Sequence, residues 1–363
     1  MNLKVGGLFS GVGGIELAFK QAGCDISWAN DFDPHAHITY KKIMKNDHYI
    51  GQMPISIEKL TTDDYKSDLT GIDILVAGFP CQAFSIAGYR KGFNDKRGNV
   101  FFNIIDILKY LKKNEDLPRV ILLENVKNFK GHDNGNTFLT VKNELEKLSY
   151  SVYSKILNTS DFTTIPQNRE RTFMICFRGE KKWKNYQFDE ESRFISNDEL
   201  KNALADCPRT LNFHNNFLIS NIKRKPLKSI RDLLEDKVTE DFYYTSFKYP
   251  NAYKLLKKSM KDFNTLYQFR RVYVRENKSG LCPTLTANMG TGGHNVPLVL
   301  VNEGKINKIR KLTPLECFRF QGYEKISLPK SMANSHLYKQ AGNSVTVPLV
   351  NMLAQNICLS LED

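Results

Sequence analysis

Apolar runs that read as buried strands alternate, in the first half of this chain, with stretches of helical periodicity. Residues 72–77, 120–123 and 172–177 are short runs rich in apolar side chains, whereas residues 101–111 and 138–148 repeat apolar side chains at helical spacing. Short apolar runs are typical of strands buried on both faces, and helices between them are typical of doubly wound sheets. The alternation therefore predicts an α/β fold with a doubly wound sheet.

The N-terminus supplies a strand, a glycine-rich turn and the start of a helix. Phe9-Ser10-Gly11-Val12-Gly13-Gly14 follows a strand-like run and precedes the helix-like residues 15–21. Glycines let a backbone approach a ligand closely, and a helix N-terminus offers free N–H groups. The next strand-like run ends at Asp31, twenty residues after Gly11, which suits a carboxylate that binds ribose hydroxyls. These features predict a nucleoside cofactor, and their spacing does not choose between a dinucleotide and S-adenosylmethionine.

A candidate nucleophile and a candidate acid follow two of the central strands. Cys81 comes shortly after residues 72–77, behind Pro80, and Glu124 comes directly after residues 120–123. Open α/β sheets bind ligands at the carboxyl ends of their strands, so both side chains are expected at one rim. Taken singly, each has a plainer interpretation, because a lone cysteine is usually a small buried hydrophobe and a lone glutamate a cap or ion-pair partner.

Five short motifs stand in one order along nearly the whole chain. Each has many chance matches alone, but five in the right order are poorly explained by coincidence. They resemble the signature blocks of DNA (cytosine-5) methyltransferases: Phe9-Ser10-Gly11-Val12-Gly13-Gly14, Pro80-Cys81-Gln82, Glu124-Asn125-Val126, Gln167-Asn168-Arg169-Glu170-Arg171 and Gly342-Asn343-Ser344-Val345.

The resemblance implies four catalytic residues. Cys81 would add its thiolate to C6 of cytosine, which makes C5 nucleophilic enough to accept a methyl group. Glu124 would share or donate a proton at N3. Arg169 and Arg171, two residues apart and therefore on one face of an extended chain, would orient the base and assist the thiolate. The plainer interpretation of the two arginines is a solvated surface charge cluster.

The resemblance also implies S-adenosylmethionine as the cofactor, S-adenosylhomocysteine as its product, and no metal. Asp31 would bind the ribose hydroxyls and Phe32 the adenine face. The family often has acids at the positions of Gly7 and Ser56, so backbone groups around Ile57 are the expected substitute at the adenine. The other expected contacts are Phe9, Gly11, Gly13, Gly14, Pro80, Val100, Asn343 and Ser344.

The charge of the chain suggests a polyanionic partner. Its formal net charge is +13, and residues 221–278 hold fifteen Lys and Arg against seven Asp and Glu, with aromatic residues between them. This mixture suits phosphate contacts, and it is equally typical of solvated charge over a small β core. Duplex DNA is the expected partner, and Gln82, Ser85, Arg97, Thr284 and Leu285 are its expected contacts.

Three segments are expected along the chain. Residues 1–178 form the Rossmann-like catalytic and cofactor-binding domain, and residues 179–328 a second, smaller and β-rich target-recognition domain. Residues 329–363 return to the catalytic domain. By resemblance, the target cytosine is flipped out of the duplex, because both faces of its ring must be reached.

Composition narrows the cellular setting. Seven scattered cysteines without a close pair argue against a disulfide framework and a zinc site, and for a reducing compartment. No apolar run approaches ~20 residues and no basic-then-apolar leader is visible, so a cytoplasmic protein without membrane contact is expected.

The chain resembles the prokaryotic or phage type of the family, which often works beside a restriction endonuclease, and a monomer is expected. Two alternatives stay open: an RNA (tRNA) cytosine-5 methyltransferase of the same fold, and a DNA-binding protein that has lost catalysis. The sequence does not disclose the recognised bases.

Overall fold

The structure is a computed structural model, and the chain divides into two compact units. Unit 1 comprises Met1–Leu157, Glu170–Lys223 and Pro348–Asp363, and unit 2 comprises Asn158–Arg169 and Arg224–Val347. The residues that the structure describes are 2–80, 100–179, 211–212, 218–219, 227–270, 272–291, 295–304 and 306–362.

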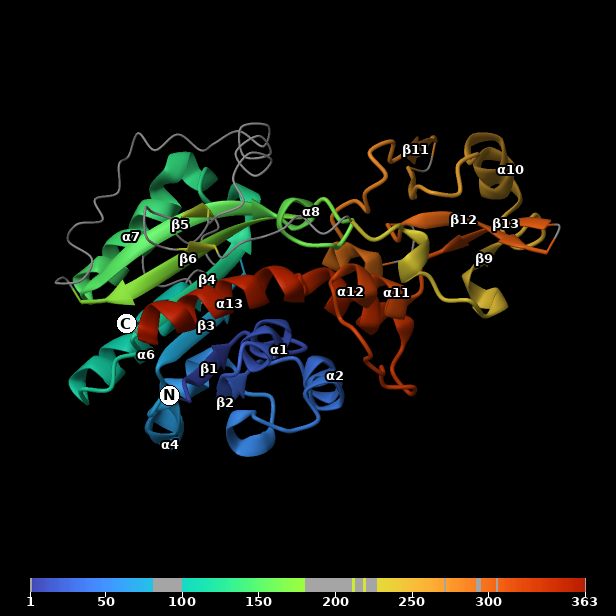
Figure 1. Cartoon of the computed structure of the whole chain (residues 1–363). Helices are drawn as coiled ribbons and strands as arrows, with labels where there is room; N and C mark the ends of the chain where they lie inside the picture. The colour runs from blue at the N-terminus through green and yellow to red at the C-terminus, as the bar shows by residue number, and fades with distance from the viewer. Residues whose placement is uncertain are drawn as a thin grey trace. The chain divides into compact units, whose positions relative to one another are not determined.

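Unit 1 is built on a six-stranded sheet with the strand order β2-β1-β3-β4-β6-β5. The first four strands of that order are parallel neighbours, and β6 runs antiparallel to β4. The predicted α/β fold is confirmed. The strands are β1 (Lys4–Leu8), β2 (Asp25–Asn30), β3 (Ile74–Gly78), β4 (Val120–Val126), β5 (Tyr150–Asn158) and β6 (Glu170–Arg178) (Figure 1).

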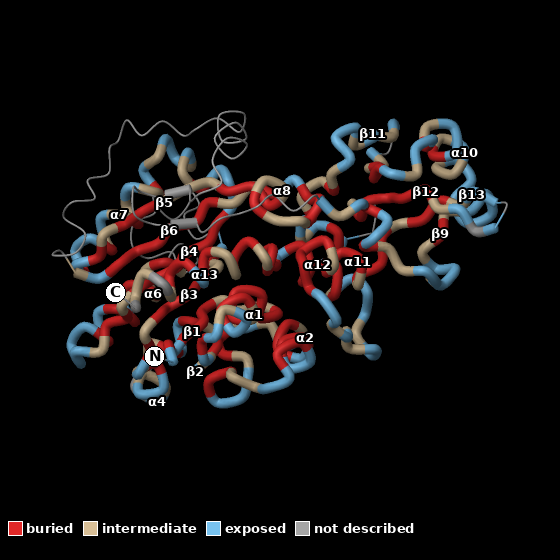
Figure 2. Tube along the Cα trace, in the orientation of Figure 1, coloured by how far each residue is buried: buried red, intermediate tan, exposed pale blue. Residues whose placement is uncertain are grey.

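Helices α6 and α7 pack against one face of this sheet. Their apolar side chains share a core cluster with Leu75 of β3, Ile121 of β4 and Met174 of β6. The alternate strand residues are buried as well, so both faces of the central strands are covered, as Figure 2 shows along β3 and β4. The helices of unit 1 are α1 (Gly14–Gln21), α2 (Pro34–Met44), α3 (Ile57–Leu60), α4 (Asp63–Lys66), α6 (Val100–Lys113), α7 (Asn136–Lys147) and α13 (Val347–Glu362).

Unit 2 contains a five-stranded sheet with the order β11-β10-β12-β13-β9. Its core gathers Leu256, Tyr267, Leu298 and Ile309. The strands are β9 (Tyr243–Tyr244), β10 (Tyr267–Phe269), β11 (Val274–Glu276), β12 (Leu298–Glu303) and β13 (Ile306–Lys311), and the helices are α8 (Thr159–Phe162), α10 (Pro250–Ser259), α11 (Pro314–Phe320) and α12 (Asn334–Asn343). A further two-stranded sheet, which belongs to unit 1, pairs β7 (Leu211–Asn212) with β8 (Leu218–Ile219).

A buried ion pair fixes β13 to α11 inside unit 2. The Arg310 guanidinium lies 2.7 and 2.8 Å from the two carboxylate oxygens of Glu316, and both side chains are almost fully buried. Thr313 caps α11 through the same glutamate, in a capping box.

The two compact units are defined by how the chain packs. The domains predicted from the sequence, with boundaries at residues 178 and 328, are defined instead by function, as the parts that bind cofactor and DNA. Those boundaries stay a prediction. Within the described residues, no helix is long and apolar enough to cross a membrane, and no group of three or more His, Cys, Asp or Glu is arranged to hold a metal ion.

Candidate cofactor and catalytic site

The glycine turn, residues 9–14, lies at the carboxyl end of β1 and leads into α1. Gly11 and Gly13 have φ values of 54° and 83°, in the left-handed region that favours glycine. A Cβ atom at Gly13 would lie 2.8 Å from the Tyr40 ring, so a larger residue does not fit there. The turn is closed by a hydrogen bond of 2.8 Å from the Gly13 N–H to the Ser10 carbonyl oxygen.

Asp31 ties the end of β2 to this turn. Its Oδ2 accepts a hydrogen bond of 2.9 Å from the Gly11 N–H, and its Oδ1 accepts one of 2.9 Å from the Asp33 N–H. Burial raises the pKa of Asp31, and these backbone donors act in the opposite direction. The carboxylate is therefore held at the turn, where the sequence predicts it.

Phe32 and the chain near Ile57 flank this carboxylate. The Phe32 side chain is 69% exposed, which is unusual for an aromatic ring that follows a buried strand. The Asn30 amide donates to the Ile55 carbonyl oxygen at 2.7 Å, and the Ile55 N–H donates to the Asp31 carbonyl oxygen at 3.0 Å. The backbone just before α3 is thereby fixed beside the end of β2.

Glu124 and Arg171 meet at the ends of their strands. Arg171 Nε lies 3.1 Å from Glu124 Oε1, and both side chains are largely buried. In the register of the sheet, Gly78 of β3 pairs with Glu124 of β4. Burial lowers the pKa of Arg171, and the charge of Glu124 opposes that change. The pair places a carboxylate and a guanidinium close to the end of β3, two residues before Pro80.

The segment that follows β3 carries the predicted nucleophile. Cys81, Gln82, Ser85 and Arg97 lie outside the described residues. On either side of this segment, the structure describes Pro80, which is exposed, and Val100, which is half-buried and is the first residue of α6. The Asn125 amide donates to the Phe79 carbonyl oxygen at 3.0 Å, so the residue after Glu124 anchors the chain that leads to Cys81. Asn125 lies in the motif Glu124-Asn125-Val126, and this anchoring role was not predicted from the sequence.

Arg169 lies inside unit 2 and is only 2% exposed. Its Nη1 donates to the Leu285 carbonyl oxygen at 2.6 Å, and its Nη2 donates to the carbonyl oxygens of Gly342, at 3.1 Å, and Ser344. The two arginines of one motif therefore have different partners, because Arg171 pairs with a carboxylate whereas Arg169 joins backbone segments of unit 2.

The remaining predicted residues belong to unit 2. Thr284 is half-buried and donates from Oγ1 to the Asn168 carbonyl oxygen at 2.6 Å, whereas Leu285 is buried. Asn343 is exposed. Ser344 is buried and shares a hydrogen bond of 2.6 Å with the Tyr323 hydroxyl.

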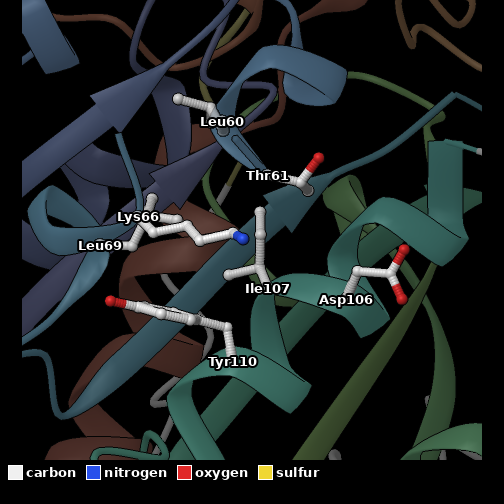
Figure 3. Close-up of a pocket in the computed structure, with 7 residues that line it drawn as sticks. All are labelled: Leu60, Thr61, Lys66, Leu69, Asp106, Ile107 and Tyr110. Atoms are coloured by element: carbon white, nitrogen blue, oxygen red, sulfur yellow. The ribbon is translucent and has the colours of Figure 1, made fainter. Parts of the chain in front are cut away.

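Unit 1 also contains a pocket of about 300 Å³ beside α3, α4 and α6 (Figure 3). The Lys66 ammonium lies 5.7 Å from the centre of the Tyr110 ring at this pocket. None of the residues predicted to bind cofactor or DNA lines it: the lining residues are Leu60, Thr61, Lys66, Leu69, Asp106, Ile107 and Tyr110.

A glycine turn after β1 and a carboxylate after β2, on a largely parallel sheet, are typical of enzymes that bind a nucleoside cofactor. The family model for C-5 cytosine-specific DNA methylase matches residues 3–358, and the chain belongs to this family. It is a DNA (cytosine-5-)-methyltransferase, and the family implies S-adenosylmethionine as its methyl donor.

Similar proteins span the whole chain. The type II methyltransferase M.Bsp6I of Bacillus sp. (strain RFL6) is 44% identical over 99% of both chains. The type II methyltransferase M.HhaI of Haemophilus parahaemolyticus is 36% identical over 98% of this chain and 94% of its own. The crystal structure of the S. pombe Dnmt2 methyltransferase, at 20% identity, covers 100% of both chains with a TM-score of 0.66, which shows the shared fold.

Proposed function

We propose that this enzyme methylates C5 of a cytosine within a specific sequence of duplex DNA. The cytosine is flipped out of the duplex and reacts through a covalent bond between Cys81 and C6. The observation that carries this proposal is the Glu124–Arg171 pair at the end of β4, in register with the end of β3 from which the chain runs to Cys81. Cytosine C5 is a weak nucleophile, so a carbon methyl transfer needs a thiol at C6 and an acid at N3.

All of the proposed steps take place on the ring of the target cytosine. The Cys81 thiolate forms a bond to C6, and the electron pair displaced from the C5–C6 double bond develops negative charge toward N3, where Glu124 supplies a proton. S-Adenosylmethionine supplies the methyl group to C5. Loss of the C5 proton to a base then restores the C5–C6 double bond and expels the Cys81 thiolate, and N3 returns its proton to Glu124. Arg171 holds the Glu124 carboxylate in place through the contact of 3.1 Å, and Arg169 is the second proposed base-orienting residue.

The residues of unit 1 fit the proposed cofactor. Asp31 is held at the turn with lone pairs left for ribose hydroxyls, and the exposed Phe32 ring offers a face for adenine. Phe9, Gly11, Gly13 and Gly14 would approach the methionyl side. Pro80, Val100, Asn343 and Ser344 complete the proposed wall, and S-adenosylhomocysteine is the proposed product.

We further propose that residues 179–328 form a target-recognition domain, and that residues 329–363 serve the catalytic domain. The basic, aromatic-rich stretch over residues 221–278 supports phosphate contacts there. Thr284 and Leu285 are proposed at the reading surface, with Leu285 as the buried support of Thr284. Gln82, Ser85 and Arg97 are proposed as contacts of the flipped cytosine and its strand.

An exchange of segments tests where the DNA sequence is read. Residues 179–308 would be replaced by the equivalent segment of a relative with another specificity, and methylated sites would be mapped by bisulfite sequencing. The catalytic residues handle one cytosine whatever its neighbours, so the methylated site is expected to follow the inserted segment. A chimaera that still methylates the parent's site would contradict the proposed domain.

The covalent step is tested with duplex DNA that contains 5-fluorocytosine at the target. Fluorine does not leave C5 as a proton does, so the enzyme is expected to stay attached to the DNA after methyl transfer. Peptide mapping of the adduct should identify Cys81. An adduct through another cysteine, or no adduct from an enzyme that methylates ordinary DNA, would disprove the assignment.

The names of the relatives support a role in a prokaryotic restriction-modification system. The type II methyltransferases M.Bsp6I and M.HhaI come from bacteria. We propose that this enzyme acts as a monomer in the cytoplasm of a prokaryotic cell, beside a restriction endonuclease that cuts the same sequence.

A further inference from the structure

Glu16, in the first turn of α1, is a buried carboxylate with no hydrogen-bond partner among the described residues. Its side chain is 1% exposed, and within the described part of the chain neither carboxylate oxygen accepts a hydrogen bond. Burying an ionised carboxylate without a donor or a counter-charge is costly, and proteins normally avoid it.

This carboxylate lies directly against the glycine turn. A Cβ atom built on Gly7 of β1 would stand 2.0 Å from Glu16 Oε1 and 2.9 Å from the Ser10 hydroxyl oxygen. The missing side chain of Gly7 therefore makes the space that the Glu16 carboxylate fills. A larger residue at position 7 would expel it.

Within the described part of the chain, the groups that act on the Glu16 carboxylate provide no positive charge. Asp31 repels it, and the hydroxyls of Tyr40 and Tyr49 are neutral groups whose own pKa values are raised by burial and by Glu16. Burial raises the pKa of Glu16 to about 7, while Ser10 and the backbone N–H of Glu16 itself favour the ionised form without reaching hydrogen-bond geometry.

A second carboxylate at the same turn, that of Asp31, already has backbone donors. Both oxygens of Asp31 accept backbone hydrogen bonds, from Gly11 and Asp33. Among the described residues, Glu16 is therefore the carboxylate of the two that accepts no hydrogen bond, and a cationic group of a ligand would supply the counter-charge that it lacks. S-Adenosylmethionine carries two cationic groups, the α-ammonium of its methionyl part and the sulfonium.

We propose that the Glu16 carboxylate binds the α-ammonium group of the methionyl part of the cofactor. This inference rests on the cofactor site proposed above. It assigns the methionyl end of the cofactor to Gly7, Ser10 and Glu16.

The test uses two ligands that differ only in the amino group. Binding of S-adenosylhomocysteine and of its deamino analogue, with hydrogen in place of the amino group, would be measured by calorimetry on the full-length protein at about pH 8. Glu16→Gln keeps the shape and removes the charge, and Glu146→Gln, at an exposed acid of α7, is the matched control.

Glu16→Gln is expected to weaken S-adenosylhomocysteine about ten- to a hundredfold and to leave the deamino analogue unchanged, because a charge-assisted hydrogen bond is lost with only one of them. Equal losses for both ligands, or none for either, would overturn the proposal. A loss seen with S-adenosylmethionine but not with S-adenosylhomocysteine would identify the sulfonium as the partner and would also overturn it.

Binding of S-adenosylhomocysteine by the wild type separates failure of this inference from failure of the proposed cofactor site. A wild type that fails to bind S-adenosylhomocysteine contradicts the cofactor site itself, whereas a wild type that binds it normally isolates the role of Glu16.

The wild type also gives a test that needs no substitution. Its preference for S-adenosylhomocysteine over the deamino analogue should fall several-fold between about pH 8 and pH 5.5 as Glu16 takes up a proton. Burial also raises the pKa of Asp31, but the two ligands have the same ribose and Asp31 serves both equally, so a constant preference would overturn the proposal.

Discussion

Replacement of Glu16 by Gln should stabilise the ligand-free protein at alkaline pH and have much less effect in acid. Burial raises the pKa of the Glu16 carboxyl from its ordinary value of 4.5 to about 7. Because the folded-state pKa lies above the unfolded one, the contribution of this group to stability is complete below about pH 4.5 and is lost as the pH rises through about 7.

The size of the effect follows from the same two values. A rise from 4.5 to about 7 corresponds to about 3 kcal/mol of stability lost between acid and alkaline pH. Gln has no proton to lose, so the difference in the free energy of unfolding between Glu16→Gln and the wild type should grow by about that amount from about pH 5 to pH 8.5.

Urea unfolding of both proteins across this pH range measures the difference, with Glu146→Gln as the control that should follow the wild type. Parallel stability curves for the wild type and Glu16→Gln would refute the reasoning, because they would mean that Glu16 titrates alike in the folded and unfolded chains. An added prediction is that saturating S-adenosylhomocysteine removes part of the difference, since it favours the wild type.

Three further predictions concern catalysis and the core of unit 2. Cys81→Ala should abolish methyl transfer, measured with labelled cofactor, while calorimetry still detects S-adenosylhomocysteine binding; residual transfer near the wild-type rate would exclude the thiol. Glu124→Gln should slow single-turnover methyl transfer about a hundred- to ten-thousandfold because it keeps the shape and removes the acid, and a wild-type rate across neutral pH would rule out protonation of N3 by this residue. Glu316→Gln should destabilise the protein by about 3–5 kcal/mol in urea unfolding because it leaves the buried charge of Arg310 uncompensated, whereas Glu240→Gln, in an exposed pair, should change stability by less than about 1 kcal/mol; similar values for both would contradict this account of the pair.

Local patterns predicted the strand–turn–helix at the N-terminus better than the contacts between distant residues. The turn at residues 9–14 and the carboxylate of Asp31 are short-range features, and a hydrogen bond from the Gly11 N–H to Asp31 joins them. The predicted role of Asp31 at the ribose stays a prediction. The apolar runs predicted the α/β fold. They did not show that β6 runs antiparallel to β4, because an apolar run contains no information about strand direction.

The sequence did not foresee the partners of Arg169 or the burial of Glu16. Arg169 bonds to the carbonyl oxygens of residues 285, 342 and 344, and contacts over such separations depend on how the chain folds back on itself. An acid in the first turn of a helix, as Glu16 is, ordinarily interacts favourably with the helix dipole while exposed. The burial of Glu16 depends on Gly7, nine residues away on another element.

The central claim is that this chain transfers a methyl group to C5 of cytosine in DNA. Purified enzyme would be incubated with S-adenosylmethionine and unmethylated duplex DNA, and the digested nucleosides would be separated and identified by mass spectrometry. The account predicts 5-methyldeoxycytidine as the methylated product, with transfer RNA left unmodified under the same conditions. Methylation at an exocyclic amino group of cytosine or adenine, or methylation of transfer RNA alone, would contradict it.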